Sequence, residues 1–104
     1  AIEPQTKFSI IIPARNEAVN IEKCLMHISN QNYPKTNYEV WVINDFSTDD
    51  TANVVLEFGK LEKNIHLINL ADIIGEKPLN SYKKKAIELA VSKAQFEWII
   101  TTDA

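Results

Sequence analysis

Residues 8–17 read FSIIIPARNE, an apolar run followed by a polar segment. The apolar run, residues 8–12, is short and rich in β-branched side chains, and Pro13 closes it. Residues 38–43, which read YEVWVI, form a second run of the same kind and also end in polar residues. Both runs are apolar at nearly every position, which is typical of strands buried on both faces of a parallel sheet.

The rest of the chain alternates between strand-like and helical patterns. Two more apolar runs follow at residues 65–70 and 96–100. Between the four runs, apolar residues recur at spacings of three and four, which predicts helices over residues 18–28, 54–61 and 86–94. The order β-α-β-α-β-α-β predicts an α/β fold, a mostly parallel sheet of about four strands with flanking helices and right-handed crossovers.

Local signals predict where these helices begin and end. Asn16 is placed to cap the first helix. Ser47 with Asp50 three residues later resembles a capping box for the second helix, while the end of that helix is left open between Gly59, which can end a helix early, and the pattern that runs to Leu61. Residues 72–80, which contain the second glycine and a proline, are expected to form a loop.

The composition bounds the class of protein. With 104 residues, 45% of them hydrophobic and 24% charged, the chain is expected to form one globular domain over residues 1–104. The net charge of −3 argues against a nucleic-acid-binding surface, which needs an excess of cations. Two glycines cannot build the glycine-rich phosphate loops, and one cysteine excludes an internal disulfide. Both tryptophans, Trp41 and Trp98, are expected in the core.

Polar residues rich in carboxylates follow three of the predicted strands. They occupy residues 13–17, 44–50 and 101–103. Because ligands bind beyond the carboxyl ends of parallel strands, these turns predict one site at that edge of the sheet. Asp45 allows two interpretations, a cap for the following helix or an acceptor for the N–H of a pyrimidine base, and the sequence leaves them evenly balanced.

Other charged positions near these turns carry similar alternatives. Glu17 either favours the dipole of the first helix or faces the site, while Arg15 offers a fork of donors to a phosphate. The lysines at positions 83–85 form a solvated face or include one that faces an anion. Asp103 comes directly after a buried strand and beside two hydroxyls, which is a typical position for a ligand of Mg²⁺ or Mn²⁺.

In order along the chain, these clusters resemble the motifs of family 2 glycosyltransferases. The matching segments are FSIIIPARNE at 8–17 for P-x-x-N-E, NDFSTDDT at 44–51 for D-D-x-S-x-D-x-T, KKKAIE at 83–88 for G-K-x-x-A-L-N, and TTDA at 101–104 for the start of D-x-D. The resemblance implies a Rossmann-like sheet, the N-terminal nucleotide-binding half of a GT-A fold. It also implies an enzyme that transfers a sugar from a nucleoside diphosphate sugar, most often a UDP-sugar, with inversion at the anomeric carbon.

The resemblance implies roles for individual residues. Pro13, Ala14 and Glu17 would line the uridine pocket, and Asp45 would hydrogen-bond the uracil. On the phosphate side, a divalent metal (Mg²⁺ or Mn²⁺), held by the complete D-x-D motif, would neutralise the leaving diphosphate. The implied nucleotide-binding set is Pro13, Ala14, Arg15, Glu17, Asp45, Lys83 and Asp103, with Asp103 as the metal ligand.

The sequence departs from the family pattern at Asn44, where a first aspartate is usual, and at Tyr82, where glycine is usual. No residue matches the second D-x-D aspartate or the catalytic base, so we expect the chain to be part of a longer enzyme and inactive alone. That enzyme is expected to be bacterial, to serve polysaccharide biosynthesis with a glycan or lipid acceptor, and to work at the cytoplasmic face of a membrane. The 104 residues themselves are expected to be soluble and able to self-associate.

A second hypothesis is a non-catalytic, doubly wound α/β binding module. Such a module would use its strand-end acids for Mg²⁺ or for helix capping. It does not account for the pattern of residues 13–17 or for the spacing within residues 45–51.

Overall fold

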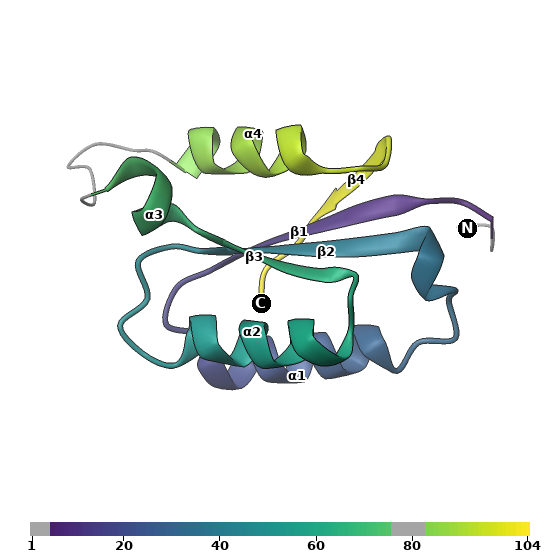
Figure 1. Ribbon diagram of the computed structural model, residues 1–104, viewed down its shortest axis with the longest axis horizontal. Coiled ribbons are helices and arrows are strands. Elements are labelled where there is room, and N and C mark those ends of the chain that lie inside the picture. Colours follow the sequence, from purple (N-terminus) through teal and green to yellow (C-terminus); the bar gives the residue numbers. More distant parts are fainter. Residues whose placement is uncertain (1–4, 76–82) are drawn as a thin grey trace.

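The computed structural model describes residues 5–75 and 83–104. Within these residues, four parallel strands form one sheet in the order β3-β2-β1-β4 (Figure 1). The strands are β1 (Phe8–Ala14), β2 (Tyr38–Asn44), β3 (Ile65–Asn69) and β4 (Trp98–Thr101). The predicted α/β fold with a parallel sheet is therefore confirmed.

Helices cover both faces of the sheet. Figure 1 shows two helices against one face, α1 (Ala18–Ser29) and α2 (Thr51–Leu61). The short α3 (Leu70–Ile74) and α4 (Lys83–Lys93) lie on the other side, and a 3₁₀ turn, η1 (Lys35–Asn37), precedes β2. In the described part of the chain, no helix is both long enough and apolar enough to cross a membrane.

The two central strands carry the core because they are covered on both faces. Ile12, Val40 and Val42 are fully buried and belong to the cluster under α1 and α2. Ile11 and Ile43 face the opposite way and pack in the cluster that α4 completes. Their alternation explains why these runs are apolar at nearly every position.

Several predicted boundaries of elements differ from those of the structure. The strand β1 continues through Pro13 to Ala14. Pro13 lies beyond the last residue that pairs with β4, and its nitrogen points to that side, so the missing N–H removes no ladder bond. The helix α2 runs past Gly59, where a Cβ would lie 3.1 Å from the carbonyl oxygen of Ile65, so the glycine permits close packing of α2 on β3. Residues 72–74 belong to α3 and not to a loop, while residues 76–80 lie outside the described residues.

Trp98 does not lie in the core as predicted, since 68% of it is exposed. It opens β4, which is at one edge of the sheet. Ile99 packs in the cluster beside α4, so Trp98 and Ile100 point to the opposite face, where both are exposed. Trp41, on the central strand β2, is half-buried and stacks on His66 with ring centroids 4.4 Å apart.

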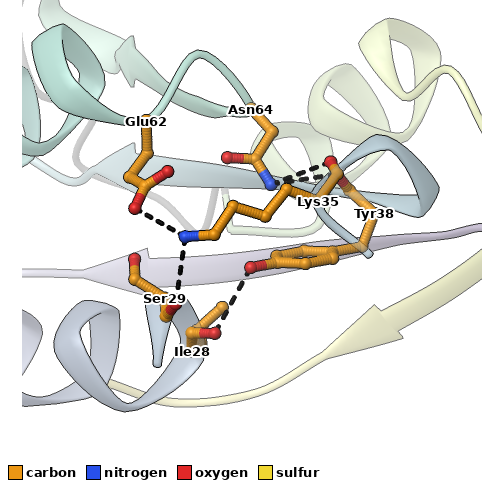
Figure 2. Close-up of polar contacts among 6 residues, drawn as sticks. All are labelled: Ile28, Ser29, Lys35, Tyr38, Glu62 and Asn64. Atoms are coloured by element: carbon orange, nitrogen blue, oxygen red, sulfur yellow. Dashed lines mark hydrogen bonds and ion pairs between the residues drawn. The ribbon is translucent and has the colours of Figure 1, made fainter. Parts of the chain in front are cut away.

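Side chains tie the connections together at the amino edge of the sheet. Lys35 Nζ donates to the carbonyl oxygen of Ser29 at the end of α1 (2.9 Å) and pairs with Glu62 Oε1 after α2 (2.6 Å), as Figure 2 shows. Asn64 Nδ2 donates to the carbonyl oxygen of Tyr38 (3.2 Å), where β2 begins. These contacts fix the start of β2 between the ends of both helices.

A buried carboxylate holds the starts of three strands at this same edge. Glu39 is only 5% exposed, and its Oε2 accepts hydrogen bonds from Ser9 Oγ and from the backbone N of Gln95, both at 2.6 Å. The backbone N of Phe96 donates to Ser9 Oγ (3.4 Å), and His66 Nε2 lies 4.0 Å from Glu39 Oε1. Glu39 therefore connects β2 to β1 and to the turn before β4 by hydrogen bonds, and its other oxygen faces His66 on β3.

We expect Glu39→Ala to lower the free energy of unfolding by about 2–4 kcal/mol, because it leaves buried donors without an acceptor. Glu39→Gln keeps one oxygen for these donors and should cost about 1 kcal/mol. Urea denaturation measures both changes. Equal losses for the two variants would contradict a hydrogen-bonding role, and Glu57→Gln on the exposed face of α2 serves as the control.

Candidate functional site

A cleft of about 380 Å³ opens at the carboxyl edge of the sheet, opposite the amino-edge contacts. It is lined by Pro13, Ala14, Arg15, Glu17, Asp45, Asp103 and Ala104. Six of the seven residues predicted to bind nucleotide are therefore brought together in one cleft. Lys83 is the first residue of α4, and its side chain lies outside the described part of the structure.

The register of the strands places the two predicted aspartates on the same cleft. The residue pair that ends the β1–β2 ladder is Ala14 and Asn44, and the backbone N of Asp45 donates to the carbonyl oxygen of Ala14 (2.9 Å). On the other side of β1, the backbone N of Thr102 donates to the carbonyl oxygen of Ile11 (3.0 Å), and Asp103 follows. Asp45 and Asp103 thus approach the cleft from strands on either side of β1.

Asn16 does not cap α1 as predicted. Glu17 occupies the N-cap position, and no side chain of its own helix makes the capping bond. Asn16 has a positive φ of 52°, and its Oδ1 reaches across to the turn after β2. There it accepts hydrogen bonds from the backbone N of Thr48 (2.7 Å) and of Asp49 (3.3 Å).

The capping box predicted for Ser47 and Asp50 was also wrong. Asp50 is the N-cap residue of α2 but makes no side-chain capping bond there. Ser47 Oγ instead accepts a hydrogen bond from the backbone N of Asn16 (3.0 Å). The side chain of Ser47 is therefore used by the neighbouring turn and not by its own helix.

The free N–H groups at the start of α1 are satisfied in the same way. Thr51 Oγ1 accepts from the backbone N of Glu17 (3.0 Å), and Asp49 Oδ2 accepts from the backbone N of Ala18 (3.2 Å). Asp49 in the turn before α2 and Thr51 at the start of α2 therefore cap α1, and the capping interpretation of the strand-end acids holds for Asp49.

These contacts lower the pKa of Asp49. The hydrogen bond from the hydroxyl of Thr51 is the largest cause, and the backbone N–H groups of Thr51 and Ala18 add to it. Burial opposes this shift and is the smaller effect. The carboxylate of Asp49 is thus kept ionised by the turn that it organises.

Asn44, which stands where an aspartate was expected, is part of this structure. Its Nδ2 donates to Asn69 Oδ1 at the end of β3 (2.8 Å), and its Oδ1 accepts from the backbone N of Ser47 (3.2 Å). An amide can do both, because it carries a donor and an acceptor. Asn44 therefore connects β3 to the turn that carries Asp45.

The remaining charges of the cleft come from the turn after β1. Arg15 is exposed and lines the cleft. Glu17 also lines it, and its Oε2 accepts a hydrogen bond from Asn20 Nδ2 (2.8 Å) in the first turn of α1. This geometry is compatible with both interpretations of Glu17, a favourable interaction with the dipole of α1 and a position facing the site.

The described residues provide only part of a binding site for a divalent metal. The described residues contain no cluster of three or more His, Cys, Asp or Glu side chains that could hold one. Asp103 is exposed and lines the cleft. Since Mg²⁺ is commonly bound by one or two carboxylates together with substrate phosphates, Asp103 fits a metal that is shared with a bound diphosphate.

Comparison with known sequences and structures identifies the family. The sequence model described as Glycosyl transferase family 2 matches residues 9–104. The chain belongs to this family. Its sheet and flanking helices match GT-A glycosyltransferase structures, as the resemblance of the motifs implied.

Three relatives illustrate the match. A protein of Trichomonas vaginalis named dolichyl-phosphate beta-glucosyltransferase ALG5D is 33% identical to this chain, in a match that covers 98% of this chain and 31% of that protein. The mannosyltransferase PcManGT from Pyrobaculum calidifontis, solved in complex with GDP-Man and Mn²⁺, superimposes with a TM-score of 0.74 at 30% identity, covering 99% of this chain and 29% of that one. Residues 1–349 of Staphylococcus aureus TarS, solved with UDP-GlcNAc, give 0.72 at 27% identity, covering 94% and 26%. The chain spans less than a third of the length of the curated relatives it matches first.

The lowered pKa of Asp49 gives the stability a pH dependence of known sign. A carboxyl whose pKa is lower in the folded than in the unfolded chain stabilises the fold above its unfolded pKa, and this contribution is lost as the pH falls through the folded value. Between about pH 6 and about pH 2.5, the free energy of unfolding of the wild type should therefore fall more than that of Asp49→Asn. Urea denaturation at a series of pH values measures this, with Asp72→Asn on α3 as the control. Parallel curves for the wild type and Asp49→Asn would contradict the assignment.

Proposed function

We propose that this chain is the donor-binding part of an inverting glycosyltransferase that uses a UDP-sugar and passes the sugar to a glycan or lipid acceptor. The observation that carries the proposal is the cleft in which Asp45 and Asp103 meet across the end of β1. The complexes of two solved relatives with GDP-Man and with UDP-GlcNAc support a nucleoside diphosphate sugar as the ligand.

Asp45 is proposed to hold the base. A carboxylate accepts hydrogen bonds and donates none, so it suits a base edge that presents N–H groups. The imide N–H of uracil meets this requirement, and Pro13 and Ala14 beside Asp45 supply an apolar wall for the ring. Guanine also presents N–H groups, which makes the comparison of UDP with GDP part of the test.

Arg15 and Asp103 are proposed to act at the diphosphate. The guanidinium of Arg15 can donate two parallel hydrogen bonds to a phosphate. Asp103 would hold Mg²⁺ or Mn²⁺ together with the phosphate oxygens, and the metal, when bound, stabilises the negative charge that develops on the leaving diphosphate. Lys83, at the first turn of α4, remains a proposed phosphate contact.

For the whole protein we propose transfer at the cytoplasmic face of a membrane, in bacterial polysaccharide synthesis. The support is family membership, with a relative named for dolichyl phosphate for a lipid acceptor and a Staphylococcus aureus relative named for poly(ribitol-phosphate) for a bacterial polymer. No residue of this sequence matches the family's catalytic base, which an inverting transfer needs to deprotonate the acceptor hydroxyl.

The first prediction of this proposal concerns binding. The chain should bind UDP in the presence of Mg²⁺ with a dissociation constant of about 1 mM, and Asp45→Asn should weaken binding about tenfold, because a neutral amide oxygen accepts the N–H of the base more weakly than a charged carboxylate does. Amide chemical shifts in an NMR titration with UDP, GDP and CDP measure this. Asp72→Asn, which lies on α3 and not on the cleft, is the matched control.

Unchanged spectra at millimolar UDP would contradict the proposed function. Equal affinity of the wild type and Asp45→Asn would contradict the role of Asp45. Tighter binding of GDP than of UDP would contradict the choice of uridine and leave the nucleotide site in place.

The second prediction concerns activity. Incubated with UDP-GlcNAc or UDP-glucose and simple hydroxyl acceptors, the chain should release UDP only at the rate of a sample without protein, because it lacks a residue that matches the base. A coupled assay for UDP measures the release. Sugar transfer by the purified chain would contradict this prediction.

A further inference from the structure

Asn16 has no role in the proposed function, although both of its neighbours, Arg15 and Glu17, line the cleft. The side chain of Asn16 reaches instead to the turn that follows β2. We propose that Asn16 is a positioning residue, which fixes the turn over residues 44–50 and so holds Asp45 on the cleft; this inference rests on the proposed function.

The contacts between the two turns run in both directions. Asn16 Oδ1 accepts from the backbone N of Thr48 (2.7 Å) and of Asp49 (3.3 Å), and also from the hydroxyl of Thr48 (3.3 Å). In return, the backbone N of Asn16 donates to Ser47 Oγ (3.0 Å). One side chain therefore satisfies two consecutive backbone N–H groups that have no helix or strand partner at this place.

The backbone explains why Asn suits this position. Asn16 has a φ of 52°, a region that β-branched and bulky residues avoid and that Asn adopts more readily than most. Its side chain is also short, and this places the amide oxygen within hydrogen-bonding distance of the neighbouring turn. Asn combines the permitted φ with the acceptor, whereas Gly supplies only the first and Ala supplies neither.

The turn that carries Asp45 is strained. On one side, the backbone N of Asp45 is bonded to the carbonyl oxygen of Ala14. On the other side, Phe46 has a positive φ of 56°, which costs energy for a residue with a bulky side chain. Such a conformation persists only when its surroundings hold it, and the contacts of Asn16 begin two residues after Phe46.

The consequence for binding follows from preorganisation. If Asp45 is already held where the base will lie, binding orders little additional backbone. If Asn16 no longer holds the turn, the binding of the base by Asp45 must also order residues 46–49. The affinity then falls without any change in the groups that touch the nucleotide.

Three substitutions separate the acceptor from the backbone strain. Asn16→Ala removes the acceptor and places a Cβ at positive φ, while Asn16→Gly removes the acceptor and accepts this φ. Asn16→Asp keeps an acceptor at the same distance. We expect the dissociation constant of UDP with Mg²⁺ to rise about tenfold or more in Asn16→Ala and Asn16→Gly, and less than about threefold in Asn16→Asp.

Hydrogen exchange provides a second measurement that does not depend on the nucleotide. The amides of Thr48 and Asp49 should exchange about tenfold or more faster in Asn16→Gly than in the wild type, and stay protected in Asn16→Asp. Asn53→Ala, which removes an exposed amide on α2 that makes only a 3.4 Å contact, should change neither measurement.

The outcomes distinguish the positioning role from the proposed function. If the wild type binds UDP and Asn16→Gly binds it equally well, the positioning role is overturned, and this variant decides even if Asn16→Ala does not fold. If the wild type binds no UDP, the proposed function fails, and the hydrogen-bonding role of Asn16 then depends on the exchange rates alone. Unchanged exchange of Thr48 and Asp49 in Asn16→Gly would overturn it.

Discussion

The parallel register of β1 with β2 is the constraint on which the carboxyl edge depends. Ala14 and Asn44 end their strands side by side, and the hydrogen bond from the backbone N of Asp45 to the carbonyl oxygen of Ala14 extends the ladder by one more bond. A shift of one residue would turn every side chain of the strand to the other face. Ser9 and Glu39 are register partners joined by a buried hydrogen bond, which such a shift would break, so this contact helps to fix where the two polar turns meet.

The two turns then hold each other, and this explains how the site is built with so little glycine. The start of a helix needs acceptors for its free N–H groups. Here the acceptors for the start of α1 come from Asp49 in the turn before α2 and from Thr51, the first residue of α2, while Asn16 before α1 supplies the acceptor for that turn. Tight turns usually depend on glycine for positive φ, but Asn16 and Phe46 adopt it here within a network of side-chain acceptors.

The sequence predicted the parts of the fold that depend on local pattern. The strands were found because burial on both faces leaves an unmistakable apolar run, and the cleft residues were found because carboxyl ends of parallel strands share an edge. The caps were predicted wrongly, since Asn16, Ser47 and Asp50 were each assigned to the nearest helix. The partners of Asn16 and Ser47 lie about 30 residues away in the sequence, and no spacing rule for caps reaches that far. Trp98 was misplaced for a similar reason, because a strand at the edge of the sheet shows the same composition as a covered one.

The charges of the cleft bear on what can bind there. Among its described lining residues, Glu17, Asp45 and Asp103 bring three carboxylates, against the one guanidinium of Arg15. An aspartate at position 44 would add to this excess, and Asn44 instead contributes an amide that is used in hydrogen bonds to Asn69 and Ser47. A diphosphate entering such a cleft would be repelled unless a cation came with it. The same excess of carboxylates that opposes a bare diphosphate favours a divalent metal, so the electrostatics of the cleft favour the two binding together and disfavour the diphosphate alone.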